Sequence, residues 1–113
     1  MKERTKQLAL RVMKLVSSLP KTVEGSVLGK QLLRSGTSVG ANYRAACKSR
    51  SKAEFVSKLG IVEEEADECG FWLELIMEHG LMPRGRVEPL HRETEEITAI
   101  VAASRKTAKG KRS

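Results

Sequence analysis

Aromatic side chains are scarce in this chain of 113 residues, where they make up only 4% of the composition. We expect most of the four aromatic residues to face predicted apolar seams: Tyr43, Phe55, Phe71 and Trp72. Proteins that read single-stranded RNA by sequence stack its bases on exposed aromatic rings. The sequence offers no such platform, so any recognition of nucleic acid would depend on shape and charge.

Long apolar runs are also missing. No stretch approaches the ~18 apolar residues of a membrane span. The first residues, Met1 to Leu19, alternate charged and apolar side chains where a signal peptide has a continuous apolar core. We therefore expect a cytoplasmic protein without a membrane partner. With 3 Pro, 9 Gly and 40% hydrophobic residues, the composition is that of one folded domain.

Motifs for catalysis and metal binding are absent or incomplete. Cys47 and Cys69 lie on predicted helices beside apolar residues, so we expect small buried side chains without a disulfide. No zinc spacing, nucleophile motif or glycine-rich phosphate loop appears. Glu88 and His91 have the Glu-x-x-His spacing of helical di-iron sites, but such sites need a second copy. We expect no enzyme activity and no cofactor.

Charge is abundant and unevenly distributed. The chain has a net charge of +7, divided into +5 for residues 1–22, +4 for 23–50, −6 for 51–82 and +4 for 83–113. A basic side could attract nucleic acid, or it could pair with the acidic side of a neighbouring subunit in a ring. The sequence leaves both possibilities open.

The clearest periodicity lies between Ser51 and Met77. Apolar residues recur there at alternating spacings of four and three over about three heptads: Phe55, Leu59, Val62, Ala66, Cys69, Leu73 and Ile76. This pattern predicts a long amphipathic helix whose other faces are acidic. We expect it to begin at a capping box of Ser51 and Glu54, and to end at His79 before a left-handed Gly80.

Three further segments show helical periodicity: residues 3–19, about 26–48 and 89–108. Ser26 is expected to cap the second helix, and Pro89 to take the first position of the fourth after a loop. The short connections predict an all-α protein, an antiparallel up-down-up-down four-helix bundle over residues 1–108. Residues 109–113 are expected to form a mobile basic tail.

Two glycines, Gly36 and Gly40, interrupt the second predicted helix at roughly 1 kcal/mol each relative to alanine. We expect a neighbouring helix to approach closely over them, with Ser38 and Asn42 forming hydrogen bonds across the contact. The alternative is a ligand pocket formed by Arg34, Ser38 and Asn42.

The same helix carries a familiar element. The run from Gln31 to Ala45, continued by 51–55, 63–66 and 72–75, resembles the four-helix-bundle proteins encoded by intervening sequences in bacterial 23S rRNA genes. The most specific mark is Arg-Ser-x-x-Ser-x-x-x-Asn, which falls on Arg34, Ser35, Ser38 and Asn42. Where many members continue with an Ile-Ala-Glu-Gly-like segment, this chain has Tyr-Arg-Ala-Ala at 43–46.

The resemblance implies a left-turning up-down bundle, often assembled as a homopentameric ring with a basic surface. A related branch, the accessory variability protein of diversity-generating retroelements, looks like the same pentamer and binds a reverse transcriptase and nucleic acid. Most other members have no established activity.

We predict a homopentamer that binds structured RNA or other nucleic acid through basic residues of the first two helices. The candidates are Lys6, Arg11, Lys14, Lys30, Arg34, Arg44, Lys48 and Arg50. Trp72, on an outer stripe with Ile61 and Leu75, is a candidate subunit contact unless it covers the core of its own bundle. The rival hypothesis is a scaffold whose cations contact an acidic partner protein without nucleic acid.

Overall fold

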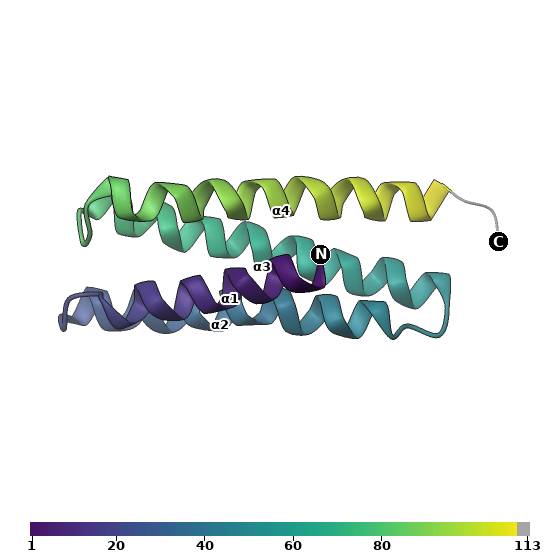
Figure 1. Cartoon of the computed structure of the whole chain (residues 1–113), viewed down its shortest axis with the longest axis horizontal. Helices are drawn as coiled ribbons and strands as arrows, with labels where there is room; N and C mark the ends of the chain where they lie inside the picture. The colour runs from purple at the N-terminus through teal and green to yellow at the C-terminus, as the bar shows by residue number, and fades with distance from the viewer. Residues whose placement is uncertain (111–113) are drawn as a thin grey trace.

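The computed structural model describes residues 1–110 as four helices. They are α1 (Lys2–Ser17), α2 (Val23–Cys47), α3 (Lys52–His79) and α4 (Arg84–Gly110). Consecutive helices pack side by side in opposite directions within a body of 50 × 21 × 19 Å (Figure 1). The predicted all-α up-down-up-down bundle is confirmed. Helix α4 includes Lys109 and Gly110 of the expected tail, whose remaining residues, 111–113, lie outside the described part of the chain.

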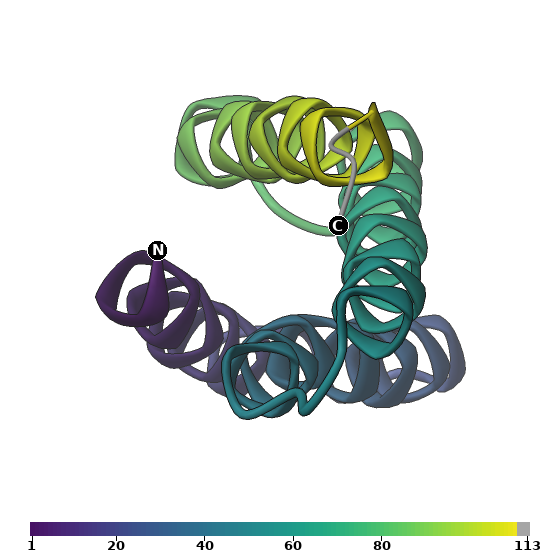
Figure 2. The ribbon, with the colours of Figure 1, turned by 90° about the vertical axis from the view of Figure 1, so that its right-hand side faces the viewer.

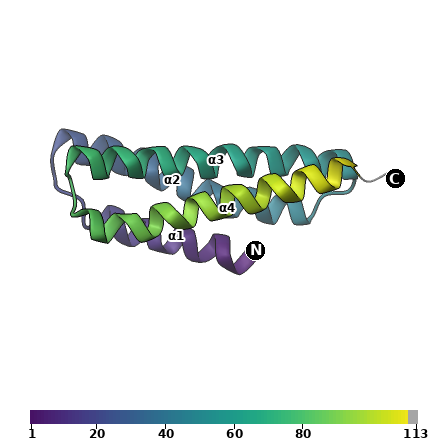
Figure 3. The same cartoon turned by 90° about the horizontal axis from the view of Figure 1, so that it is seen from above.

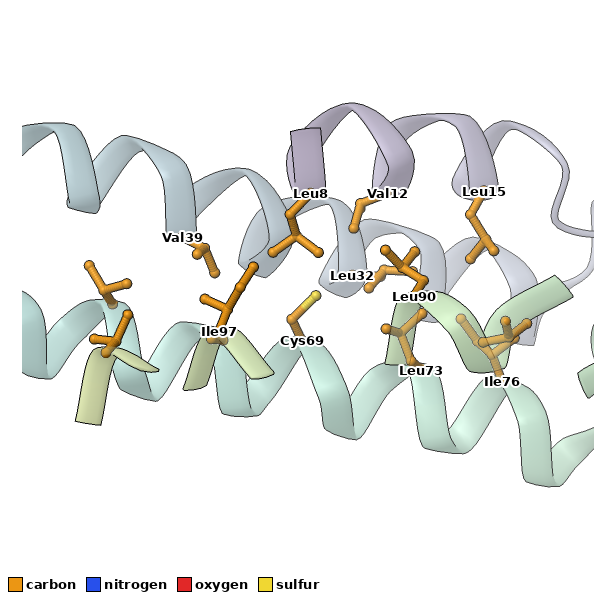
Figure 4. Packing of buried hydrophobic residues seen from close by; sticks show 14 of the residues in the cluster. Leu8, Val12, Leu15, Leu32, Val39, Cys69, Leu73, Ile76, Leu90 and Ile97 are labelled. Carbon is orange, nitrogen blue, oxygen red and sulfur yellow. The ribbon is translucent and has the colours of Figure 1, made fainter. Parts of the chain in front are cut away.

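Helix α3 forms the centre of the core, as its periodicity predicted. Six of its seam residues are fully buried: Leu59, Val62, Ala66, Cys69, Leu73 and Ile76. Leucine and valine side chains from α1 and α2, with Leu90 and Ile97 from α4, point toward them (Figure 4). Phe55, the first seam residue, is only partly buried. None of the helices in residues 1–110 is long and apolar enough to cross a membrane.

Helix α1 is shorter than its neighbours, with 16 residues against 25 in α2 and 27 in α4. It begins near the middle of the bundle's length and covers only the half that holds the α1–α2 connection (Figure 1, Figure 3). In the end view, α2, α3 and α4 form three sides of a square that is open toward α1 (Figure 2). Ile100 and Ser104 continue the predicted stripe of α4 but are exposed, because α1 does not reach them.

Helices α1 and α2 approach closely over glycine, as predicted. A Cβ atom at Gly36 would lie 2.8 Å from Cγ2 of Val12, and one at Gly40 would lie 3.3 Å from the carbonyl oxygen of Thr5. The predicted hydrogen bonds across this contact are wrong. Asn42 donates through Nδ2 to the carbonyl oxygen and to Oγ of Ser38, both at 2.9 Å and both within α2. Residues two apart lie on opposite sides of a helix, which turns Ser38 and Asn42 away from α1.

The start of α2 differs from the prediction. The helix begins at Val23, and its cap is Thr22, whose Oγ1 accepts a hydrogen bond from the Gly25 amide at 3.0 Å. Ser26, the expected cap, is already helical.

Helix α4 also starts earlier than predicted, at Arg84. The Arg86 amide donates to the carbonyl oxygen of Pro83 at 3.0 Å, so Pro83 marks the start. Pro89 lies inside the helix, where it lacks the amide that would bond to the carbonyl of Gly85.

Both predicted ends of α3 are confirmed. Oγ of Ser51 accepts from the Glu54 amide at 3.1 Å, although the Glu54 carboxylate approaches the amide of Arg50 instead of that of Ser51. Gly80 has φ 77° and ψ 27°, and the amide of Leu81 donates to the carbonyl of Ile76. These bonds satisfy carbonyl groups that a helix end otherwise leaves unpaired.

Arg4, on α1, joins this helix to α4. Its Nε donates to Oε2 of Glu93 at 2.7 Å, and its Nη2 to Oε1 of Glu93 at 2.8 Å and of Glu96 at 3.0 Å. The two bonds to Glu93 form a fork that fixes the geometry of both side chains. Arg4 thus holds α1 against α4.

This ion pair makes a pH-dependent prediction. Hydrogen bonding from Arg4 lowers the pKa of Glu93, so the pair stabilises the fold above the ordinary glutamate pKa and is lost as pH falls through the lowered value. We expect Glu93→Gln to lower the free energy of unfolding by about 1 kcal/mol at pH 7, and the difference to shrink near pH 2.5. Urea unfolding at both pH values measures this, and an equal difference at both would contradict it.

Candidate nucleic-acid interface

All eight cations predicted to contact nucleic acid are exposed, on α1, on α2 and at the corner after α2. Seven of them make no ion pair with another residue in 1–110: Lys6, Arg11, Lys14, Lys30, Arg44, Lys48 and Arg50. The eighth, Arg34, is held by acidic residues of the same chain. The structure therefore divides the predicted set into two groups.

Arg34 reaches from α2 to α3. Its Nη1 donates to Oε2 of Glu65 at 3.1 Å, and its Nη2 pairs with Glu68. Oε1 of Glu68 also accepts a hydrogen bond from Nε1 of Trp72 at 3.3 Å. These contacts compensate the charge of Arg34 within the fold and tie the two helices together.

The other motif residues also have partners inside the bundle. Ser35 is fully buried, and its Oγ donates to the carbonyl oxygen of Gln31 at 3.0 Å. Its hydroxyl lies beside Cys69, where burial raises the pKa of the thiol to about 12. Asn42 donates a hydrogen bond to Oγ of Ser38. All four motif residues thus have hydrogen-bond partners within the chain.

Three of the unpaired cations form one stripe on α2, which we call the α2 stripe: Lys30, Arg44 and Lys48. Their separations of fourteen and four residues are close to whole numbers of helical turns, and the stripe is about 27 Å long at 1.5 Å per residue. The backbone of Lys6 lies against α2, with its amide 3.8 Å from the position of a Cβ at Gly40. Lys6 therefore belongs beside this stripe.

Arg11 and Lys14 lie elsewhere. The charge of Arg11 contributes to the lowered pKa of Glu93, which places Arg11 on the side of α1 toward α4. Lys14 follows three residues later, about one turn along the same side. The structure therefore does not gather all the predicted cations on one stripe.

The acidic residues are concentrated in the other half of the chain. Residues 1–50 contain eleven cations and two acids, whereas 51–110 contain eight cations and twelve acids. Two cations of α4 are paired with acids of this half, Arg92 with Glu88 at 3.8 Å and Arg105 with Glu63 at 3.1 Å. The bundle therefore has a basic α1–α2 half and an acidic α3–α4 half.

Glu88 and His91, the residues with di-iron spacing, have separate partners. Nε2 of His91 lies 3.1 Å from Oε2 of Glu74, and its Nδ1 lies 3.4 Å from Oε1 of Glu95. Glu88 pairs with Arg92. Within the described residues, no group of three or more His, Cys, Asp or Glu side chains is placed to hold a metal ion.

A second surface is apolar. Trp72 is partly buried against the core, and beside it Phe71 is 49% exposed, with ring centroids 5.2 Å apart. Phe71 is therefore the exception among the four aromatic residues, most of which were predicted to face apolar seams. Val23 and Val27 are 76% and 54% exposed. We call the whole set the outer apolar patch: Val23, Val27, Leu28, Phe71, Trp72 and Leu75.

Part of this patch is hollowed into a groove of about 610 Å³, lined by Val23, Val27, Leu28 and Leu75 with polar residues around them. The sequence pattern did not identify Val23 and Val27, because residues 21–25 were predicted to be a connection. The helical spacing of four between these valines was the signal that could have shown them.

Comparison with known proteins agrees with the sequence motif. The model of the 23S rRNA-intervening sequence protein family matches residues 1–103. A crystal structure of a protein with unknown function from the S23 ribosomal protein family of Bacteroides thetaiotaomicron is similar, with 35% identity and a TM-score of 0.87. The match covers 93% of this chain and 97% of that one. No curated protein matches the chain. The chain therefore belongs to the 23S rRNA-intervening sequence protein family.

Proposed function

We propose that this protein is a non-enzymatic homo-oligomer, assembled as a pentamer, that binds structured RNA or another nucleic acid through cations of α1 and α2. The observation that carries the proposal is the α2 stripe, whose three cations are exposed and make no ion pair within residues 1–110. The three cations also lie on one side of a single helix, whereas Arg4, Arg34 and Arg105 are held in ion pairs with acids of the same chain.

The stripe suits a phosphate backbone. Its length of about 27 Å corresponds to roughly eight base-pair steps at 3.4 Å each. Thr37 and Ala41, which lie between Lys30 and Arg44 on the same side, are small enough to let a phosphate chain approach the helix. Since the stripe contains no aromatic ring, it would bind by charge and shape without reading bases.

The outer apolar patch supports self-association. Monomeric proteins rarely expose a large contiguous apolar surface, and such patches mark contacts with other proteins. Aromatic residues such as Phe71 and Trp72 are enriched at the centres of interfaces. An oligomer would also present several α2 stripes to one nucleic acid, which raises the overall affinity.

The first test is binding to a structured rRNA fragment and to duplex DNA across a salt series, with the mass of the assembly followed by light scattering. Contacts from the α2 stripe and Lys6 would neutralise four phosphates per subunit, so affinity should fall roughly 50- to 150-fold between 50 and 200 mM salt. Replacing Arg11 and Lys14 with glutamine should weaken binding if the interface continues onto α1. No binding at 50 mM salt by an intact oligomer would overturn the nucleic-acid proposal.

A second test concerns assembly. The double variant Val27→Glu and Phe71→Glu places charges on the outer apolar patch, and burying a charge in an interface is unfavourable. We expect its mass in light scattering to fall to that of the 12.5 kDa chain. Met13→Glu is the matched control, because Met13 is 49% exposed on α1, outside the patch. Trp72→Ala is less informative, because Trp72 also packs on the core of its own bundle.

The second candidate function is a scaffold that engages an acidic partner protein. It is favoured by a groove beside Cys47, between the end of α2, the start of α3 and the last turns of α4. The groove has a largely apolar lining, in which Lys52 is the one charged residue. Cys47 itself is exposed, contrary to the prediction that both cysteines are buried.

A further inference from the structure

The exposed cations along α2 are unevenly spaced. Arg44 and Lys48 lie one turn apart at its C-terminal end. Lys6 of α1 lies close to them, because its backbone amide is 3.8 Å from the position of a Cβ at Gly40, one turn before Arg44. None of the three cations makes an ion pair with a residue in 1–110. We call this group the Arg44 cluster: Lys6, Arg44 and Lys48.

A second group lies at the other end of α2. Lys21 and Lys30 line one groove of about 400 Å³, formed by the end of α1, the α1–α2 connection and the first turns of α2. Both lysines are exposed, and neither makes an ion pair with a described residue. Glu24, the one acid of α2, lines the groove of the outer apolar patch instead. We call Lys21 and Lys30 the Lys30 cluster. Lys21 was not among the predicted cations, because residues 21–25 were predicted to be a connection.

Between the two clusters, the outward side of α2 carries no charge. Lys30 and Arg44 are fourteen residues apart, which is about 21 Å along the helix. The one cation in this interval, Arg34, is turned toward α3 and held there by two glutamates. The side chains that point outward in the interval are Leu33, Thr37 and Ala41. Helix α2 therefore presents two sets of cations with a neutral interval between them.

This spacing fits a double-stranded nucleic acid better than a single strand. Proteins that follow a single strand combine a continuous positive groove with aromatic rings for the bases, and the neutral interval has neither. In a duplex, the two phosphate backbones run along the two sides of a groove, and the major groove of B-DNA is about 12 Å wide. The interval of about 21 Å exceeds that width. A helix lying across a groove of this size therefore places one cluster on each backbone.

The side chains of the interval favour RNA over DNA. Leucine, threonine and alanine are too short to reach the floor of a major groove that is about 8.5 Å deep. The minor groove of duplex RNA is wide and shallow, and it displays 2′-hydroxyl groups. Oγ1 of Thr37, which is half-buried, donates its hydrogen to the carbonyl oxygen of Leu33 at 2.7 Å. Its lone pairs are left to accept a hydrogen bond from a 2′-hydroxyl group.

We infer that α2 binds double-stranded RNA across the minor groove, with the Arg44 cluster on one phosphate backbone and the Lys30 cluster on the other. The inference rests on the proposed function, because it uses the α2 stripe. It adds the class of nucleic acid, the contact with both strands and a further binding residue, Lys21. With the α2 stripe and Lys6, Lys21 makes five cations per subunit that neutralise phosphates.

The first measurement compares three fluorescent probes of one sequence: an RNA duplex of about 20 base pairs, the corresponding DNA duplex and the single-stranded RNA. Their affinities for the full chain in its assembled form are measured at about 0.1 M salt. We expect the RNA duplex to bind roughly tenfold more tightly than either of the other probes, because it alone combines two backbones with a shallow groove.

The variant Lys21→Gln tests the Lys30 cluster. Loss of one phosphate contact should weaken binding to the RNA duplex roughly five- to eightfold at about 0.1 M salt. Arg86→Gln is the matched control, because Arg86 is an exposed cation of α4 at the same end of the bundle, without an ion pair to a described residue (Figure 1). This control should keep its affinity. Equal affinities of the two variants would overturn the contact with both strands.

The variant Thr37→Val tests the contact with the minor groove, because it removes the hydroxyl group and keeps the shape of the side chain. Binding to the RNA duplex should weaken roughly two- to tenfold, the effect of one hydrogen bond, and binding to the DNA duplex should not change. Thr107→Val, at an exposed threonine of α4, should change neither affinity. Circular dichroism and urea unfolding check that all the variants fold.

The outcomes separate this inference from the proposed function. Equal binding of the three probes, or tighter binding of the DNA duplex or of the single strand, would overturn the inference and leave nucleic-acid binding by the α2 stripe in place. An equal effect of Thr37→Val on RNA and DNA duplexes would also overturn it. If no probe binds even at about 50 mM salt, the proposed function fails, and the inference fails with it.

Discussion

Replacing Gly36 with leucine is expected to lower the free energy of unfolding by about 3 kcal/mol, the upper part of the range for an overpacked core. The first side-chain atom would already lie 2.8 and 2.9 Å from the two γ-carbons of Val12. Val12 is fully buried, and a valine in a helix has essentially one rotamer, so it cannot turn aside. Moving α1 instead would open the contacts at Gly29 and Gly40.

The smaller change Gly36→Ala separates packing from helix propensity. Alanine favours the helix by about 1 kcal/mol over glycine, so a net loss would come from the contact with Val12. Gly60→Ala is the matched control, because a Cβ there meets only the Arg105 side chain, at 3.8 Å. Urea unfolding should show Gly60→Ala stabilised and Gly36→Ala destabilised. If both gain stability equally, α1 and α2 are not as close as the structure places them.

The elements that could be predicted from sequence are those fixed by local signals. Helix α3 has an unbroken seam, a serine that caps its first turn and a glycine in the left-handed region at its end. The predicted start of α2 was wrong because serine is at least as good a cap by residue type as threonine, which favoured Ser26 over Thr22. The choice depends on packing, since a Cβ at Gly25 would lie 2.1 Å from the carbonyl oxygen of Pro20. That contact involves the connection before the helix, which periodicity does not describe.

For the candidate sites too, features set by local sequence could be predicted and features set by the packing of the helices could not. Exposure of the basic residues followed from helical periodicity, and all eight are exposed. The pairing of Arg34 with Glu65 and Glu68 depends on the register between α2 and α3, which the sequence of one chain does not show. The groove beside Cys47 could have been found, because the predicted first helix was already shorter than the second. Comparing their lengths would have shown that the far end lacks a fourth helix.

Reversing the charges of the α2 stripe should have the largest effect on nucleic-acid binding. The triple variant Lys30→Glu, Arg44→Glu and Lys48→Glu removes three phosphate contacts per subunit. At about 0.1 M salt each contact contributes 0.7 to 0.9 logarithmic units through counterion release, so affinity should fall roughly 100- to 500-fold. The slope of the logarithm of affinity against the logarithm of salt concentration should also become shallower, by about two to three.

Net charge alone could weaken binding, and a matched variant separates that effect from the position of the charges. Arg84, Arg86 and Lys106 are exposed cations of α4 that make no ion pair with a described residue. Changing them to glutamate alters the charge by the same amount as the stripe variant. If the α2 stripe is the interface, this control keeps most of the affinity and the full salt dependence. Equal losses in both variants would mean that nucleic acid responds to the overall field of the protein, and the stripe would lose its assignment.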